Sequence, residues 1–305
     1  MKILVATEKP FAAEAVEGIK KATDNANYEL VLLEKYTDKA ELLEAVADVD
    51  AMIIRSDKAT KEVLDAAKNL KVIVRAGAGY DNIDLEAATA NNVVAMNTPG
   101  QNSNAVAELV FGMMVMSARN SYNGSAGTEL KGKKVGIHAY GNVGKLVALI
   151  AKGFGMEVLA FDPFVSKEEI EKDGVTVVDT VEELYSACQY VSLHIPANDK
   201  TKKSINYDLL SKMPKGGTLV NTARKEVIDE EGVLKLMSER KDINFISDIA
   251  PDAKAKFEEE FPNNVFFTPK KMGAQTAEAN INAGVAAANQ IINFLEKGDD
   301  TFRVN

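Results

Sequence analysis

The sequence contains no tryptophan, only two histidines and a single cysteine, Cys188. One cysteine cannot form an internal disulfide, which is typical of proteins in a reducing compartment. No apolar run approaches the roughly 20 residues that a membrane-spanning helix requires. The start of the chain, MKILVATEKPF, holds an apolar run too short for the core of a signal peptide. We therefore expect a cytoplasmic protein without a membrane partner.

Clusters of basic residues are also missing. The chain has 36 Lys and Arg against 45 Asp and Glu, which gives a net charge of −9. Because nucleic-acid binding depends on neutralising phosphates with clustered cations, this composition argues against a nucleic-acid partner. An anionic small molecule would have to be held by local cations. We expect no metal site.

Short apolar runs alternate with amphipathic stretches along the whole chain. A length of 305 residues exceeds what one hydrophobic core usually serves, so two domains are expected. The alternation predicts βα units and parallel sheets covered by helices on both faces. Pro99 and Gly100 interrupt the first series, and long helices are predicted at about 103–119 and 276–297. The predicted fold class is α/β, with two doubly wound parallel-sheet domains.

The strongest local pattern is KKVGIHAYGNVGKLVALIAKGFGMEVLAFDPF, which fits a strand, a tight turn, a helix, a strand and an acid. A dinucleotide-binding turn has the form Gly-x-Gly-x-x-Gly. Here its three glycine positions are Ala139, Gly141 and Gly144, and Gly141 lets the backbone approach a pyrophosphate. Asp162 ends the next strand, where a carboxylate can accept from ribose hydroxyls and repel a 2′-phosphate. The pattern favours NAD, the alternative being an ordinary tight turn with a helix-packing glycine.

Six segments in series carry a resemblance to a known family. They are VRAGAGYDNIDLEAA, NTPGQNSNAVAEL, the turn described above, VSLHIP, LVNTARKEVIDEEGVL and MGAQTAEA. In this order they resemble the D-2-hydroxyacid dehydrogenases, over essentially the whole chain. The resemblance implies a flavodoxin-like substrate domain built from residues 1–98 and 277–305 and a central Rossmann-type NAD domain, 99–276. It also implies a hinged cleft and a homodimer formed mainly through the NAD domains.

The resemblance is narrower still, to the members that oxidise D-3-phosphoglycerate to 3-phosphohydroxypyruvate with NAD, the first step of L-serine biosynthesis. Longer members carry a C-terminal serine-sensing domain, and we expect this chain to be a short form without it. The main alternative is a reductase of glyoxylate or hydroxypyruvate, or another D-2-hydroxyacid dehydrogenase. A further alternative is an NAD-sensing binding protein without turnover.

The resemblance assigns roles to residues near the cofactor. Arg224 would clamp the substrate carboxylate and polarise the C2 oxygen, since a guanidinium offers several fixed donors and stays charged. The alternative is a surface arginine on a strand-to-helix loop. The remaining assignments are Asn142 and Val143 at the pyrophosphate, Ile195 by the adenosine, Thr222, Ala223, Asp248, Gly273 and Ala274 around the nicotinamide, and Asn102 as a substrate contact.

A phosphorylated substrate needs a phosphate site, and two arginines match those that similar enzymes place at the substrate. Arg55 and Arg75 each follow an apolar strand run, at the sheet edge where α/β proteins bind ligands. Gly77 and Gly79, close by, are expected to leave their backbone N–H groups for an anion. The alternative for Arg55 is a local ion pair with Asp57.

Two adjacent lysines stand where the family has its proton-transfer histidine. That position is Lys271 or Lys270, of which we prefer Lys271, and the glutamate that orients the histidine is replaced by Ala253. A carboxylate would raise the pKa of a lysine above its usual ~10.4, so its absence favours a lysine base. Asp252 remains a candidate orienter. The alternative for the lysines is a solvated surface pair.

The two histidines each end a predicted strand, and either could in principle transfer the proton. A histidine at a strand end is more often simply hydrogen-bonded, and the family places His194 toward the adenosine. We therefore interpret His138 and His194 as structural. Cys188 lies in a helical pattern and is expected to serve packing.

Overall fold

The structure, a computed structural model, describes residues 1–305 and divides them into two compact units. One unit comprises Met1–Asn102 with Gln275–Asn305, and the other comprises Ser103–Ala274. The changeovers predicted from the sequence lie at 98/99 and 276/277. Thr98 donates its backbone N–H to the carbonyl of Gly77 at 3.0 Å, which holds the start of the first connection within the first unit.

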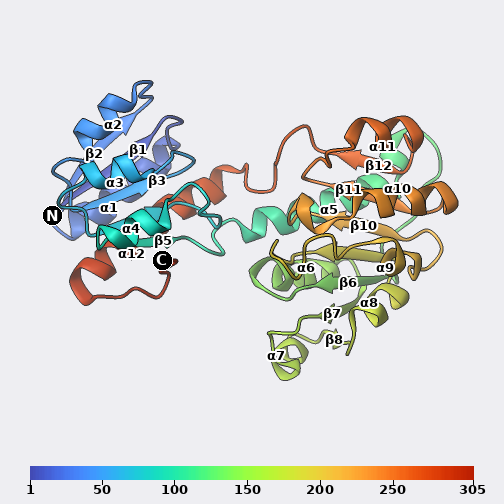
Figure 1. The fold of residues 1–305 in the computed structure, drawn as a ribbon. Coiled ribbons are helices and arrows are strands. Elements are labelled where there is room, and N and C mark those ends of the chain that lie inside the picture. Colours follow the sequence, from blue (N-terminus) through green and yellow to red (C-terminus); the bar gives the residue numbers. More distant parts are fainter. The chain divides into compact units, whose positions relative to one another are not determined.

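The first unit is built on a parallel sheet of five strands in the order β2-β1-β3-β4-β5. This is the flavodoxin-like order, in which strands are added on one side of β1 first and then on the other, so that the strand order reverses between β1 and β3. Figure 1 shows the strands with the C-terminus beside β5, where Val304 donates to the carbonyl of Ala95 at 2.8 Å. The strands are β1 (Lys2–Thr7), β2 (Glu29–Glu34), β3 (Ala51–Ile54), β4 (Val72–Arg75) and β5 (Val94–Asn97).

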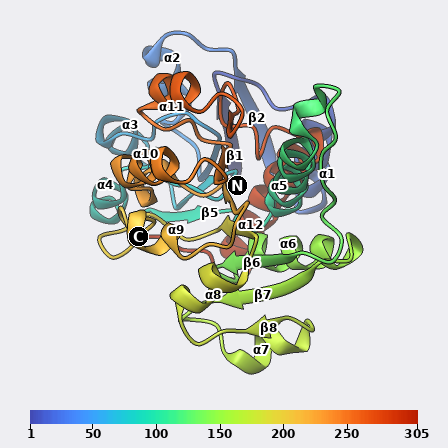
Figure 2. The same cartoon turned by 90° about the vertical axis from the view of Figure 1, so that its right-hand side faces the viewer.

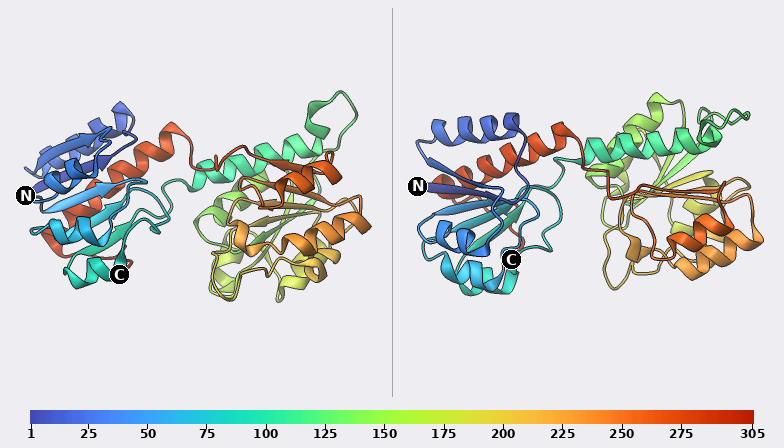
Figure 3. Two further views of the ribbon diagram at one scale, coloured as in Figure 1. Left: turned by 45° about the horizontal axis from the view of Figure 1, so that its top comes forward. Right: turned by 90° about the horizontal axis from the view of Figure 1, so that it is seen from above.

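Helices cover both faces of this sheet, as the continuous apolar strands predicted. All four residues of β3 are buried. One face packs Ile3 and Val5 against Ile19 and Ala283 of two helices, which lie side by side in Figure 3. These two are α1 (Ala13–Asn25) and α12 (Ala277–Lys297), and the opposite face carries α2 (Lys39–Ala45), α3 (Lys61–Ala66) and α4 (Leu85–Ala90).

The second unit is built on a parallel sheet of seven strands in the order β12-β11-β10-β9-β6-β7-β8. Six of the seven, β8-β7-β6-β9-β10-β11, follow the Rossmann order, in which the strand order reverses between β6 and β9, and β12 adds a seventh strand beside β11. Figure 2 shows β6, β7 and β8 side by side. The strands are β6 (Lys134–His138), β7 (Glu157–Phe161), β8 (Thr176–Val177), β9 (Tyr190–Leu193), β10 (Thr218–Asn221), β11 (Asn244–Ser247) and β12 (Val265–Phe267).

The helices of this unit also divide between the two faces (Figure 3). On one face lie α5 (Ser103–Ala118), α6 (Asn142–Gly153) and α7 (Lys167–Lys172); on the other lie α8 (Val181–Ala187), α9 (Tyr207–Ser211), α10 (Glu230–Glu239) and α11 (Lys254–Glu260). Two short 3₁₀ helices, η1 (Asn120–Tyr122) and η2 (Lys225–Val227), complete the element list. The predicted α/β class with two doubly wound parallel sheets is confirmed.

Local capping explains where two helices begin. Thr276 accepts from the backbone N–H of Ala279 at 3.1 Å, so α12 starts within one residue of the predicted position. At the start of α8, Thr180 accepts from Glu183 N–H at 3.2 Å. The Glu183 carboxylate accepts from the backbone N–H of Asp179 and not from that of Thr180, so the reciprocal capping box that a Thr followed three residues later by a Glu predicts is not formed. No helix combines the length and the apolar character needed to cross a membrane.

Candidate active site

The turn between β6 and α6 has the geometry of a phosphate-binding turn. Ala139 adopts φ 81°, the left-handed conformation that the first glycine of the pattern normally supplies. Gly141 is the residue just before α6 and provides no side-chain cap, and an added Cβ there would meet nothing within 4 Å. At Gly144 an added Cβ would lie 2.4 Å from the Ala139 carbonyl oxygen. The N–H groups at the start of α6 are therefore open to an anion, and Gly144 permits close helix packing.

Asp162 ties the end of β7 to this turn. Its carboxylate accepts from the backbone N–H of Tyr140 at 2.7 Å and from that of Phe164 at 2.7 Å. The residue predicted to bind ribose thus also fixes the turn. Beside it, Asn142 is exposed and Val143 is half-buried.

The two histidines lie at the carboxyl ends of adjacent strands and are hydrogen-bonded, as the sequence predicted. His138 Nδ1 lies 3.3 Å from the Tyr185 hydroxyl, and His194 Nε2 lies 3.0 Å from the Ser192 hydroxyl. Burial lowers the pKa of His138 to about 4 and that of His194 to about 3, against the attraction of Asp162 for a His138 cation. Both imidazoles are therefore neutral near pH 7.

The end of β10 positions Arg224. Asn221, fully buried, accepts from the backbone N–H of Ala223 at 2.9 Å and donates to the Arg224 carbonyl at 3.0 Å. This role was not predicted from the sequence, although asparagine three residues before the arginine is the residue type that closes such turns. The Arg224 guanidinium donates to the Ala223 carbonyl at 2.9 Å and forms no ion pair with a carboxylate. The hydroxyl of Thr222 is buried without a hydrogen-bond partner.

Asp248, at the end of β11, holds the loop that carries the two lysines. The residue is 1% exposed. Its Oδ1 accepts from Met272 N–H at 2.6 Å and from the Thr268 hydroxyl at 3.0 Å, while its Oδ2 accepts from Gly273 N–H at 2.8 Å. Lys270 and Lys271 lie between these anchors.

Both lysines are exposed, as is Asp252, the candidate orienter. Its carboxylate lies 2.5 Å from the ammonium of Lys225. Asp252 thus already has an ion-pair partner on η2. The backbone N–H groups of Asp252 and Ala253 donate to the Glu230 carboxylate, each at 2.8 Å.

Arg55 is held by carbonyl groups and by an amide. Its Nη1 donates to the carbonyls of Lys9 and Pro10, its Nη2 donates to Asn280 Oδ1 at 2.6 Å, and its guanidinium lies 5.0 Å from the ring centroid of Phe11. Burial lowers the pKa of Arg55, although Asp57 acts in the opposite direction.

The alternative interpretation of Arg55 as the ion-pair partner of Asp57 is wrong. The Asp57 carboxylate accepts from Glu8 N–H at 2.7 Å and from the Tyr36 hydroxyl at 2.9 Å, and from Arg55 it accepts only the backbone N–H, at 3.4 Å. Although Arg55 and Asp57 are two residues apart in the sequence, their side chains bind different partners.

Arg75 lies beside Arg55 at the carboxyl edge of the first sheet. Ile54, which precedes Arg55, pairs with Arg75, and Arg75 Nε donates to the Arg55 carbonyl at 3.0 Å. The expectation that the Gly77 N–H is available to an anion is wrong, because it donates to the Arg75 carbonyl at 2.9 Å in a tight turn. Asn82, missed by the sequence analysis, braces the same loop by donating to the Arg55 carbonyl at 3.2 Å.

The other predicted residues fall within one unit or the other. Ile195, Ala223 and Gly273 are buried and Ala274 is half-buried, all in the second unit. Asn102 is half-buried and ends the first segment of the first unit.

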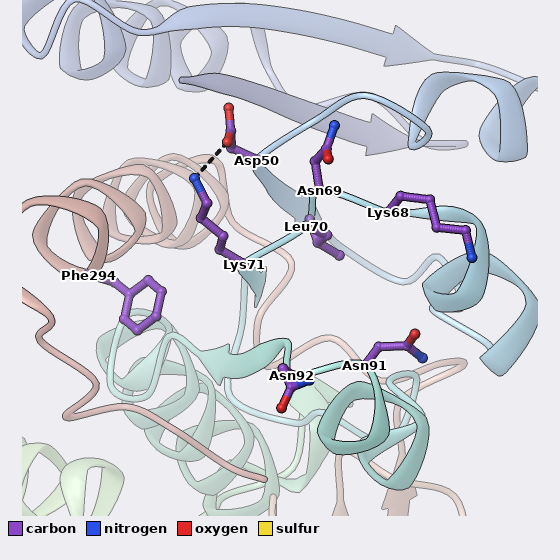
Figure 4. A pocket seen from close by; sticks show the side chains of 8 residues that line it. All are labelled: Asp50, Lys68, Asn69, Leu70, Lys71, Asn91, Asn92 and Phe294. Atoms are coloured by element: carbon purple, nitrogen blue, oxygen red, sulfur yellow. Dashed lines mark hydrogen bonds and ion pairs between the residues drawn. The ribbon is translucent and has the colours of Figure 1, made fainter.

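A hollow of about 590 Å³ in the first unit lies at the opposite edge of the sheet from the arginines. Figure 4 shows it between Phe294 of α12 and residues that precede β4 and β5. Two lysines line the hollow. The ammonium of Lys71 pairs with the Asp50 carboxylate at 2.9 Å, and the side chain of Lys68 points away from the hollow. We therefore do not assign the phosphate site to this hollow.

Comparison with known proteins identifies the family. Residues 104–270 match the model for the D-isomer specific 2-hydroxyacid dehydrogenase, NAD binding domain. The whole chain superposes on 98% of a crystal structure of cofactor (NAD+) bound 3-phosphoglycerate dehydrogenase in Entamoeba histolytica, with 49% identity and a TM-score of 0.87.

Curated relatives agree with this. The D-3-phosphoglycerate dehydrogenase of Methanocaldococcus jannaschii is 38% identical over 279 residues, which are 84% of this chain and 52% of that protein. The hydroxypyruvate reductase of Thermotoga maritima is 33% identical over 287 residues, 88% of this chain and 92% of that one. The chain thus spans about half the length of the Methanocaldococcus relative. The resemblance seen in the sequence and the choice of NAD are confirmed, and the chain belongs to the D-isomer specific 2-hydroxyacid dehydrogenases.

Proposed function

We propose that the protein oxidises D-3-phosphoglycerate at C2 to 3-phosphohydroxypyruvate with NAD, the first step of L-serine biosynthesis. The observation that carries this proposal is the 49% identity to a 3-phosphoglycerate dehydrogenase over nearly all of both chains. The pair Arg55 and Arg75 at one sheet edge supports a phosphorylated acid as substrate. We assign the first unit to substrate binding and the second to NAD.

The residues of the second unit fit the cofactor. The uncapped start of α6 at Gly141, Asn142 and Val143 suits a pyrophosphate, and the unpartnered hydroxyl of Thr222 suits a polar group of the nicotinamide end. When bound, NAD accepts the hydride that leaves C2. The remaining contacts in this proposal are Asp162 at the ribose, Ile195 at the adenosine, and Ala223, Asp248, Gly273 and Ala274 around the nicotinamide.

Arg224 and Lys271 carry the chemistry in this account. Arg224 binds the substrate carboxylate in a bidentate manner and polarises the C2 oxygen. Lys271 takes the C2 hydroxyl proton during oxidation and returns it during reduction. Arg75, Arg55 and Asn102 bind the rest of the substrate.

NADH formation with D-3-phosphoglycerate, compared with D-glycerate, tests the proposal. We expect wild-type protein to favour the phosphorylated acid in kcat/KM, and Arg75→Ala to lose about 10- to 100-fold on that substrate alone, the value of a charge-assisted contact. Equal loss on both substrates would remove the phosphate assignment.

Two alternatives have their own signatures in this assay. Faster NADH oxidation with hydroxypyruvate or glyoxylate than with the phosphorylated keto acid would favour a reductase, which the similarity to the Thermotoga maritima enzyme supports. Nucleotide binding without turnover of any 2-hydroxyacid would favour an NAD-sensing protein.

We also propose a cytoplasmic homodimer joined through the second unit. Exposed apolar side chains on α6 and directly after it support this. Leu149 is 66% exposed, and Phe154, which follows α6, is 40% exposed and stacks on Phe111 of α5 with the ring centroids 5.0 Å apart. Light scattering of wild type and Leu149→Glu tests the dimer, and the variant should be monomeric. An unchanged mass would exclude this surface. Cell fractionation tests the location.

A further inference from the structure

The carboxylate of Asp248 closes the lysine loop from both ends. At the start of the loop it accepts from the Thr268 hydroxyl, and at the end it accepts from the consecutive N–H groups of Met272 and Gly273. The Asp248 carbonyl accepts from the same Thr268 hydroxyl at 2.7 Å. Only Pro269, Lys270 and Lys271 lie between these anchors. One buried side chain therefore fixes both ends of the loop that carries the lysines.

The absence of a side chain at Gly273 allows the loop to approach the Asp248 carboxylate. An added Cβ at Gly273 would lie 3.0 Å from Asp248 Oδ2 and 3.2 Å from Val106 Cγ2, so a glycine lets the loop reach the carboxylate. The anchors are buried, with Asp248 1% and Thr268 4% exposed, whereas the two lysines are exposed. A loop whose two ends are fixed can hold the exposed side chains between those ends in a defined position.

We propose that Asp248 is a positioning residue for proton transfer, which acts by closing the 268–273 loop and thereby placing Lys271. This inference rests on the proposed role of Lys271. It gives Asp248 a task that a cofactor contact would not require, since three of its hydrogen bonds already go to the loop. A carboxylate suits this task because both oxygens only accept, whereas an amide NH₂ would face one of the N–H donors.

The loop closure is tested by hydrogen exchange in Asp248→Asn, read by mass spectrometry on the peptide that contains residues 268–273. Loss of a backbone N–H bond to a charged acceptor should raise exchange there by about tenfold or more. Asp242→Asn is the matched control, because Asp242 precedes the same strand and its Oδ2 accepts from Gly216 N–H at 2.8 Å. That variant should leave exchange in 268–273 unchanged. Unchanged exchange in Asp248→Asn would overturn the proposal.

The action through Lys271 is tested by a double-mutant cycle. Asp248→Asn should lower kcat by about 10- to 100-fold through misplacement of the amine, a larger effect than any change in the Kd for NADH that follows from its proposed place beside the nicotinamide. In a Lys271→Ala background the same change should have almost no further effect on kcat. Thr268→Val should give a weaker form of the same result.

The outcomes separate the two claims. Equal loss of kcat from Asp248→Asn in both backgrounds, or a loss confined to NADH affinity, would overturn the positioning role. If Lys271→Ala keeps full kcat, the proposed role of Lys271 fails and the positioning role for proton transfer fails with it, whereas the exchange result would still decide the loop closure. A circular dichroism spectrum and melting curve for each variant show that a loss does not come from unfolding.

Discussion

The guanidinium of Arg75 occupies the space into which a side chain at Gly77 would project. A Cβ added at Gly77 would lie 1.6 Å from Arg75 Nη1 and 2.4 Å from Cζ. The backbone at Gly77 has φ 151°, and its N–H and the Arg75 carbonyl close a tight turn at 2.9 Å. The position of this arginine therefore depends on the absence of a side chain two residues later.

Gly77→Ala should therefore displace Arg75. We expect KM for D-3-phosphoglycerate to rise by about tenfold or more, because a charge-assisted contact is lost, with little change for unphosphorylated substrates. Gly298→Ala is the matched control in the same unit, since Gly298 has φ 70° but open space around it. It should cost about 1 kcal/mol of stability and leave KM unchanged. An equal KM effect from both variants would show that strain alone is responsible.

Ala139→Gly should stabilise the second unit. A left-handed alanine costs about 1–2 kcal/mol, whereas a glycine costs roughly 0.4–1 kcal/mol through the greater freedom of the unfolded chain, so a net gain of about 0.5–1 kcal/mol is expected. Urea unfolding measures this. Ala148→Gly, in α6, is the control and should destabilise by about 1 kcal/mol. A destabilised Ala139→Gly would show that the Ala139 methyl group contributes more packing than strain.

Acid should destabilise the second unit through its two histidines. Both have folded-state pKa values, about 4 and about 3, below the usual 6.5, so the folded state binds fewer protons than the unfolded state. Their contribution is present above the unfolded pKa and is lost as pH falls from about 6.5 toward 4, with a slope of up to ~2.7 kcal/mol per pH unit for two protons.

Urea unfolding at several pH values checks this, with His138→Asn and His194→Asn as comparisons. Each variant is expected to be less stable at pH 7 but to show a shallower fall between pH 6.5 and 5. Wild-type stability that is flat across this interval would contradict the assignment of two neutral imidazoles in the folded state.

Local patterns in the sequence predicted the elements that depend on local chemistry. The run Ala51–Ile54 is apolar at every position, which only a strand covered on both faces requires, and it forms a central strand. The start of α12 falls within one residue of the predicted position, and it is set locally because the Thr276 cap involves only the next three residues. The spacing of Ala139, Gly141 and Gly144 likewise predicted the turn between β6 and α6.

The side-chain partners were not predictable in the same way. Arg55 donates to Asn280, 225 residues later, and Asp248 binds residues 20 to 25 positions on, so neither relationship leaves a local pattern. Ala139 breaks the glycine pattern yet adopts its conformation, since the surrounding tertiary structure overrides residue preference. The sequence therefore suggested candidate residues for the site but not the contacts that hold them in place.

The role of Lys271 is tested most directly by the steady-state kcat of NADH formation from D-3-phosphoglycerate in Lys271→Ala and Lys270→Ala. The two lysines are adjacent and both are exposed, so each controls for the charge and loop effects of the other. A positioned base contributes about 10²- to 10⁴-fold, and we predict a loss of that size in Lys271→Ala with a much smaller loss in Lys270→Ala. Near wild-type kcat in Lys271→Ala would contradict the account.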